Sequence, residues 1–199
     1  MQIILHRRNT INELISTPQK YGIEVDIRSY GEHLVIHHDP FIKGELFEDW
    51  IKNYNHQTLI LNIKEEGLES NLIQIMNHYK INDYFFLDQS FPFLIKWSNL
   101  GERRCAVRIS EFESIETAIN LSGKVQWTWI DCFTKFPLTK EDFLALKRAS
   151  FKTCLVSPEL QGKNPETSIP ELINFLDKND IIADAVCTKR PDLWETIAR

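Results

Sequence analysis

The feature that most limits the fold of this chain is the regular alternation of short strand-like segments with helix-like segments along its 199 residues. Eight segments rich in β-branched, aromatic and aliphatic residues predict strands: residues 3–6, 23–27, 59–64, 84–88, 105–109, 126–131, 153–157 and 183–188. Strands that alternate with helices favour a parallel sheet. Eight such units favour an α/β fold closed into a (β/α)8 TIM barrel, and we expect one domain over residues 1–199.

The segments between the strands carry apolar residues at helical spacing, which predicts helices. They are residues 10–19, 45–54, 68–79, 91–98, 114–121, 139–149, 168–178 and 191–198. Two of them begin with a capping residue that is followed three positions later by an acidic one, Thr139 with Asp142 and Ser168 with Glu171. We therefore expect these two helices to begin immediately after Thr139 and Ser168.

One further strand-like segment, residues 34–38, does not fit the simple count of eight. A short connection that contains Gly31 separates it from the second strand. A glycine in such a connection favours a hairpin. We expect a short hairpin extension after the second strand, which would bring His38 back towards Glu24 and Asp26.

Composition excludes several classes of protein. The formal net charge is −5 and no run of five like charges occurs, which argues against a sequence-independent nucleic-acid binder. No apolar run reaches the roughly 18 residues that a membrane span requires, and no signal peptide is visible. The four cysteines form no Cys-x-x-Cys pair and predict buried free thiols in a reducing compartment. We expect a soluble cytoplasmic protein.

Polar side chains at the carboxyl ends of the predicted strands indicate a site, because catalytic residues of barrels lie there. Glu24 and Asp26 are two residues apart on one strand and therefore point to the same face. Such a pair of carboxylates can share one hard cation. His6 and His38 flank this pair, and two such imidazoles suit the cleavage of a phosphoester, because one can take up a proton while the other gives one. An enzyme is therefore favoured over a binding module.

Several short motifs together resemble those of the glycerophosphodiester phosphodiesterase family. The segment Glu-Val-Asp-Ile-Arg at residues 24–28, followed by Leu-Val-Ile-His-His-Asp-Pro at 34–40, is similar to the core signature of that family. His6-Arg7 stands where the family has His-Arg-Gly. Further similar motifs lie at residues 61–64, 90–91 and 185–192. The resemblance implies a (β/α)8 barrel, a divalent cation and hydrolysis of a phosphodiester.

Position by position, the resemblance assigns roles to the candidate residues. His6 and His38 would be the acid–base pair, and Arg7 and Lys64 would bind phosphate oxygens. Glu24, Asp26 and the residue at position 62 would bind Mg2+ or Ca2+. The family has a carboxylate where this chain has Asn62, and the amide oxygen adds no charge. We therefore expect weaker ion binding unless Glu65 or Glu66 takes the place of the missing carboxylate.

Two residues of the sixth predicted strand, Trp129 and Asp131, are also candidates for substrate binding at the barrel mouth, although packing explains Trp129 at least as well. The leading hypothesis is a metal-dependent hydrolase of a small glycerophosphodiester-like substrate. The first alternative is a phosphodiesterase or lyase for another head group. The second is a catalytically silent barrel that binds a phosphorylated ligand, which Asn62 favours. The sequence does not indicate an oligomeric state.

Overall fold

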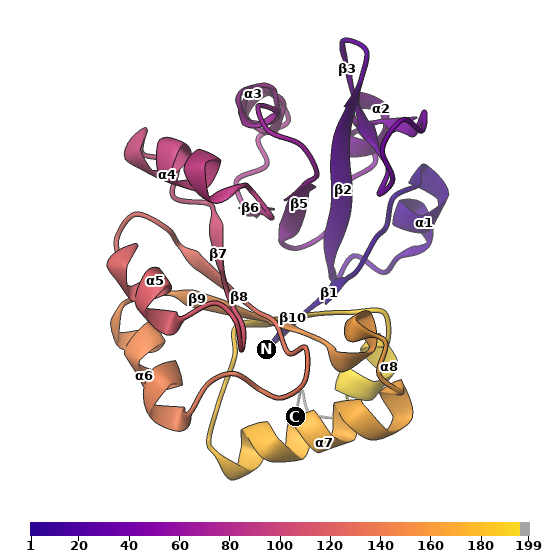
Figure 1. Ribbon diagram of the computed structural model, residues 1–199. Coiled ribbons are helices and arrows are strands. Elements are labelled where there is room, and N and C mark those ends of the chain that lie inside the picture. The colour runs from indigo at the N-terminus through magenta and orange to yellow at the C-terminus, as the bar shows by residue number, and fades with distance from the viewer. Residues whose placement is uncertain (196–199) are drawn as a thin grey trace. The chain divides into compact units, whose positions relative to one another are not determined.

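The computed structural model describes residues 1–195, and its chain forms two compact units (Figure 1). The N-terminal unit contains residues 5–100. The C-terminal unit contains residues 1–4 together with the described residues from 101 onward. Each unit is a mixed α/β arrangement in which parallel strands are connected by helices, and each is described by itself.

The N-terminal unit is built on three parallel strands in the order β2, β5, β6. Their bounds are β2 Gly22–Tyr30, β5 Leu59–Ile63 and β6 Tyr84–Leu87. The helices of this unit are α1 Ile11–Ser16, α2 Phe47–Ile51, α3 Glu69–His78 and α4 Phe91–Asn99. The register of β2 against β5 places Asp26 opposite Asn62, so both residues lie on the same face near the carboxyl end of the parallel ladder.

A hairpin extends from β2, as the sequence predicted. The end of β2 pairs antiparallel with β3 (His33–Ile36), and β3 pairs antiparallel with β4 (Glu45–Leu46). The connection is tighter than expected, because β2 continues to Tyr30 and only Gly31 and Glu32 separate the paired residues Tyr30 and His33. Gly31 has a φ of 63°, which a glycine adopts at no steric cost and which suits such a turn.

The C-terminal unit holds strands in the order β1, β10, β9, β8, β7, and the pairs β10–β9, β9–β8 and β8–β7 are parallel. The strands are β1 Gln2–Leu5, β7 Ala106–Ile109, β8 Trp127–Ile130, β9 Lys152–Val156 and β10 Ala185–Thr188. The helices are α5 Ile115–Asn120, α6 Lys140–Arg148, the 3-10 helix η1 Pro158–Gln161, α7 Pro165–Lys178 and α8 Pro191–Trp194. Each of the eight expected strands is therefore found, and closure into a (β/α)8 barrel stays a prediction.

The predicted helix starts were right for one helix and wrong for another. Thr139 caps α6 and forms a reciprocal capping box with Asp142, as predicted. The expected start after Ser168 is wrong, because Asn164 accepts a hydrogen bond from the Glu166 N–H and begins α7 one turn earlier. Of the predicted helix 191–198, residues 196–198 lie outside the described residues. None of the helices within residues 1–195 is both long and apolar enough to cross a membrane.

Candidate active site

Two fully buried carboxylates on β2 form the centre of the candidate site. Residues Gly22–Ile27 of β2 are all buried, so the strand has helices or neighbouring strands on both faces. Glu24 and Asp26 are both 0% exposed. Because an ionised carboxylate in the interior is costly unless donors or cations surround it, the neighbours of these two side chains define what the site can do.

Glu24 is held by donors from two directions. The backbone N–H of Arg7 donates to Oε2 at 2.7 Å, and the amide of Asn62 donates to Oε1 at 2.8 Å. His6 Nε2 lies 3.9 Å from Oε2. Arg7 has a φ of 52°, an uncommon conformation for a residue with a side chain, and this turn directs its N–H towards the carboxylate.

The surroundings of Glu24 favour its protonated form. Burial, with a second contribution from the neighbouring charge of Asp26, raises the pKa of Glu24 from 4.5 to about 7. The hydrogen bonds from Asn62 and from the Arg7 backbone, and the charge of Lys64, act in the opposite direction and only partly offset that rise. The carboxyl group of Glu24 can therefore gain or lose a proton near neutral pH. A cation bound beside it would favour the ionised carboxylate.

Asp26, in contrast, is surrounded by cations and by an amide. Arg7 Nε lies 3.3 Å from Oδ2 and Lys64 Nζ lies 3.2 Å from Oδ1. The side chain of Asn9 donates to Oδ2 at 2.9 Å and accepts from the backbone N–H of Asp26 at 3.1 Å. Lys64 also lies 3.7 Å from Asp88 Oδ2. The two residues predicted to bind phosphate, Arg7 and Lys64, thus lie at the carboxylate pair.

His38, the second predicted acid–base residue, lies just after β3 and lines a cavity of about 580 Å³. Its Nδ1 is 2.8 Å from Oδ1 of Asp39. Arg7 and Asn9 line the same cavity, so it borders the group of residues around Asp26. The backbone contributes as well, because the N–H of His37 donates to the carbonyl oxygen of Asp26 at 3.1 Å and ties this segment to β2.

The structure thus brings His6, Arg7, Lys64 and Asn62 to the carboxylate pair, and it places His38 on a cavity that Arg7 also lines. It also adds a residue to which the sequence assigned no role. This residue is Asn9, and its only sequence signal is its place between His6-Arg7-Arg8 and the helix cap Thr10. Glu65, expected as a possible third carboxylate, instead accepts a hydrogen bond from the backbone N–H of Ser29, which draws it to the hairpin.

Trp129 and Asp131 belong to the C-terminal unit. Both are buried, at 5% and 1% exposure. Asp131 accepts hydrogen bonds from Arg108, from Gln161 and, at 3.2 Å, from the backbone N–H of Cys132. Its charge is therefore already matched by Arg108 within that unit, and its role in substrate binding stays a prediction.

The side-chain oxygens of Glu24, Asp26 and Asn62 suit a hard divalent cation, although only two of these three side chains are carboxylates. Among residues 1–195 no group of three or more His, Cys, Asp or Glu side chains is placed to hold a metal ion. Glu24 and Asp26 supply two carboxylates, and Asn62 supplies an amide whose buried Oδ1 accepts no hydrogen bond from the described residues. A buried acceptor without a donor calls for a water or a cation. Oxygen ligands of these kinds are those that Mg2+ and Ca2+ prefer.

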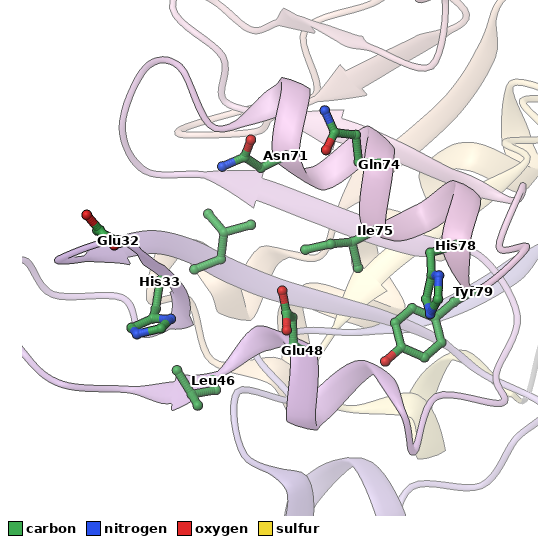
Figure 2. Close-up of a pocket in the computed structure, with 10 residues that line it drawn as sticks. Glu32, His33, Leu46, Glu48, Asn71, Gln74, Ile75, His78 and Tyr79 are labelled. Carbon is green, nitrogen blue, oxygen red and sulfur yellow. The ribbon is translucent and has the colours of Figure 1, made fainter.

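A second cavity of about 530 Å³ lies elsewhere in the N-terminal unit, between the hairpin strands and α3. Figure 2 shows Glu32 and His33 at one end of it and His78 and Tyr79 at the other, with Glu48 between them. None of the predicted site residues lines this cavity. Of these two cavities, the one beside His38 is the one lined by Arg7 and Asn9, the neighbours of Asp26.

Comparison with known proteins identifies the fold. The crystal structure of a glycerophosphodiester phosphodiesterase from Agrobacterium tumefaciens strain C58 matches with a TM-score of 0.67 and 14% identity, over 99% of this chain and 98% of that one. The chain has the fold of the glycerophosphodiester phosphodiesterases. A glycerophosphoryl diester phosphodiesterase from Parabacteroides distasonis matches with a TM-score of 0.66 and 13% identity, over 99% of this chain and 86% of that one. No protein-family model and no curated protein matches the sequence.

Proposed function

We propose that this protein is a phosphodiester hydrolase that acts on a small glycerophosphodiester-like substrate, and that the chain forms a single (β/α)8 barrel domain. The observation that carries the proposal is the buried pair Glu24 and Asp26 with Arg7 and Lys64 beside it. A structural role explains this arrangement poorly, because burying two carboxylates together costs stability that a pair of apolar side chains would not.

A divalent cation, Mg2+ or Ca2+, would be held by Glu24, Asp26 and Asn62. When bound, it would neutralise charge on the phosphate and on the developing transition state. Arg7 and Lys64 already lie within 3.3 Å of Asp26, and their N–H groups can turn to phosphate oxygens that arrive beside it. Both cations would then hold the phosphodiester in place and stabilise its additional negative charge.

Proton transfer is assigned to His6 and His38. His6 Nε2 lies 3.9 Å from Oε2 of Glu24, so this imidazole stands beside the ion that the carboxylate pair would hold. Asp39 at Nδ1 of His38 favours the tautomer that carries its proton there, which leaves Nε2 as the acceptor. One histidine can therefore deprotonate the attacking oxygen while the other protonates the leaving alkoxide.

The second candidate function is a catalytically silent barrel that binds a phosphorylated ligand. Asn62 favours it, because an amide in place of a carboxylate leaves less negative charge to hold a divalent cation. A phosphodiesterase or lyase for another head group is a variant of the first proposal. A cytoplasmic location is supported by the four cysteines, which are buried free thiols.

The deciding experiment is an assay of glycerophosphocholine and of a chromogenic phosphodiester with Mg2+, Ca2+ and Mn2+. His6→Ala and His38→Ala should each lower kcat by about 10²- to 10⁴-fold, the usual contribution of acid–base catalysis. His78→Ala, which changes an exposed histidine on α3, is the matched control and should leave kcat unchanged. Phosphate-dependent thermal stabilisation without turnover would support the silent binder instead.

A further inference from the structure

Lys64 lies between two carboxylates of the N-terminal unit. Its Nζ is 3.2 Å from Oδ1 of Asp26 and 3.7 Å from Oδ2 of Asp88. The backbone of Lys64 is fixed to β2, because its N–H donates to the carbonyl oxygen of Ile27 at 3.1 Å. The ammonium group, in contrast, is carried on a flexible chain of four carbons. Lys64 can therefore shift its charge between Asp26 and Asp88 by side-chain rotation alone.

Asp88 comes directly after β6, and the pairing of β6 with β5 places Leu87 opposite Asn62. The φ of Asp88 is 58°, a left-handed conformation that Asp and Asn adopt more readily than most residues with a side chain. This turn explains an Asp or an Asn at position 88, but it does not explain the negative charge. The side chain of Asp88 is partly exposed, whereas that of Asp26 is fully buried. An ammonium group beside Asp88 therefore keeps more of its contact with water.

The charges around the carboxylate pair balance without a divalent cation. Glu24 and Asp26 carry at most two negative charges, and Arg7 and Lys64 carry two positive ones. Mg2+ or Ca2+ would add two further positive charges to a buried site, and a buried excess of charge is costly. Ion binding is therefore favoured if one of the two side-chain cations moves to another carboxylate.

The other carboxylates of this region have partners of their own. Glu65 accepts a hydrogen bond from the backbone N–H of Ser29 and lies 3.9 Å from Arg28. The cavity on the side of Arg7 is lined by three further carboxylates, each held by a local hydrogen bond: Glu13, Asp39 and Glu45. Within residues 1–195 none of these three forms an ion pair with Arg7. Asp88 is the carboxylate that already contacts one of the two cations.

We propose that Asp88 supplies the negative charge that Asn62 lacks, and that it does so through Lys64 instead of by contact with the ion. When a divalent cation binds at Asp26, Lys64 moves to Asp88 and leaves Oδ1 of Asp26 to the ion. That oxygen is buried and accepts no hydrogen bond from the described residues, so the ion pair with Lys64 is what occupies it. Asp88 is thus a positioning residue, and this role rests on the ion binding of the proposed function.

The test is calorimetric titration of the full chain with Mg2+ and with Ca2+. Asp88→Asn keeps the left-handed turn and removes the charge, and it should weaken ion binding about fivefold, the size of one partly exposed ion pair. Asp88→Gly also removes the charge while allowing the turn, so it should weaken binding equally. In a Lys64→Met background there is no ammonium group to move. Asp88→Asn should then change the affinity by less than about twofold, which a double-mutant cycle measures.

Asp180→Asn is the matched control. Asp180 also has a left-handed φ, of 51°, and an ion pair with a lysine, since Nζ of Lys140 lies 2.7 Å from its Oδ2, but it belongs to the C-terminal unit. Its substitution should leave ion affinity unchanged. Circular dichroism will confirm that each variant is folded, and Lys64→Gln takes the place of Lys64→Met if the latter does not fold.

An undiminished affinity in Asp88→Asn would overturn the proposal, as would an absence of ion binding in the wild type. A loss that persists in the Lys64→Met background would also overturn it and indicate that Asp88 acts on the ion directly. These binding measurements are separate from turnover. A chain that binds the ion as expected and hydrolyses nothing would contradict the proposed hydrolase alone, and a hydrolase whose ion affinity does not depend on Asp88 would contradict only this inference.

Discussion

The imidazole of His38 and the carboxylate of Asp39 form a side-chain pair, with Nδ1 of the histidine 2.8 Å from Oδ1 of the aspartate. The hydrogen bond from His38 lowers the pKa of Asp39, so the carboxylate stays ionised at neutral pH. The neighbouring His37 makes a different contact, with its Nδ1 3.1 Å from the carbonyl oxygen of Asp39. The backbone N–H of Asp39 also donates to that Nδ1 at 3.0 Å. Asp39 therefore orients both imidazoles, and His38 is the one that is paired with its carboxylate.

Asp39→Asn should lower kcat by about tenfold to a hundredfold, the effect expected when the group that orients a functional histidine is altered. The KM should change little, because Asp39 is not assigned to substrate binding. Steady-state kinetics on the chromogenic phosphodiester measure both values. Asp49→Asn, an equivalent change at an exposed aspartate paired with Lys52 on α2, should leave kcat unchanged. Equal kinetics for Asp39→Asn and the wild type would show that His38 needs no orienting partner.

The raised pKa of Glu24 predicts a pH-dependent stability. Because its pKa is about 7 in the folded chain and 4.5 as a free side chain, protonation of Glu24 stabilises the fold fully below about 4.5. This contribution is lost as the pH rises through about 7. Glu24→Gln is neutral at every pH and should lack that loss. Denaturant unfolding without metal should therefore show the variant gaining stability over the wild type between about pH 5 and pH 8.

The same carboxyl group predicts proton release on metal binding. A divalent cation at Glu24 favours the ionised form, so binding should be tighter above pH 7 and should displace protons below it. Calorimetry with Mg2+ or Ca2+ in two buffers of different ionisation enthalpy measures the number of protons released. Glu24→Gln should abolish the buffer dependence. Metal binding that is independent of buffer and of pH in the wild type would place the ion away from Glu24.

Asn62→Asp tests whether position 62 contacts the ion. The substitution restores a third carboxylate opposite Asp26 and should raise the affinity for Mg2+ or Ca2+ about tenfold or more through its added charge. Without metal the variant should be less stable than the wild type, because it adds negative charge beside two buried carboxylates. Thermal unfolding with and without the ion measures both effects. A destabilised variant whose metal affinity is unchanged would exclude residue 62 from the ion site.

Local sequence patterns were enough to place much of this site. The spacing of Glu24 and Asp26 on a strand fixed their common face, and parallel pairing of β2 with β5 then brought Asn62 opposite Asp26. The motif resemblance predicted the fold that the structural comparisons confirm. The common face of two residues on a strand and the fold can be predicted from periodicity and short motifs, because these patterns depend only on residues that are close in the sequence.

Other contacts depend on the path of loops, which no local pattern specifies. Asn9 reaches Asp26 only because the left-handed turn at Arg7 folds the chain back over β2. Glu65 turns to Ser29 because β2 runs on to Tyr30, beyond its predicted end. The start of α7 was misplaced for a different reason, because Asn164 followed by Pro165 provides a cap and a first helical residue one turn before Ser168.

Gly44→Ala should test the shape of the loop that borders the cavity beside His38. A Cβ atom at this position would lie 2.2 Å from the oxygen and 2.7 Å from the carbon of the Ile36 carbonyl group, and this backbone cannot move without disturbing β3. We expect a loss of about 1–3 kcal/mol in the free energy of unfolding, or about 2–4 °C in Tm for each kcal/mol. Chymotrypsin should also cleave after Phe41 faster than in the wild type, because the loop must detach from β3.

Gly31→Ala is the contrasting variant, since its Cβ would meet open space and its cost is backbone strain at the hairpin turn. It should lower Tm without accelerating cleavage after Phe41, and an equal acceleration in both variants would show that Gly44 does not specifically hold the loop.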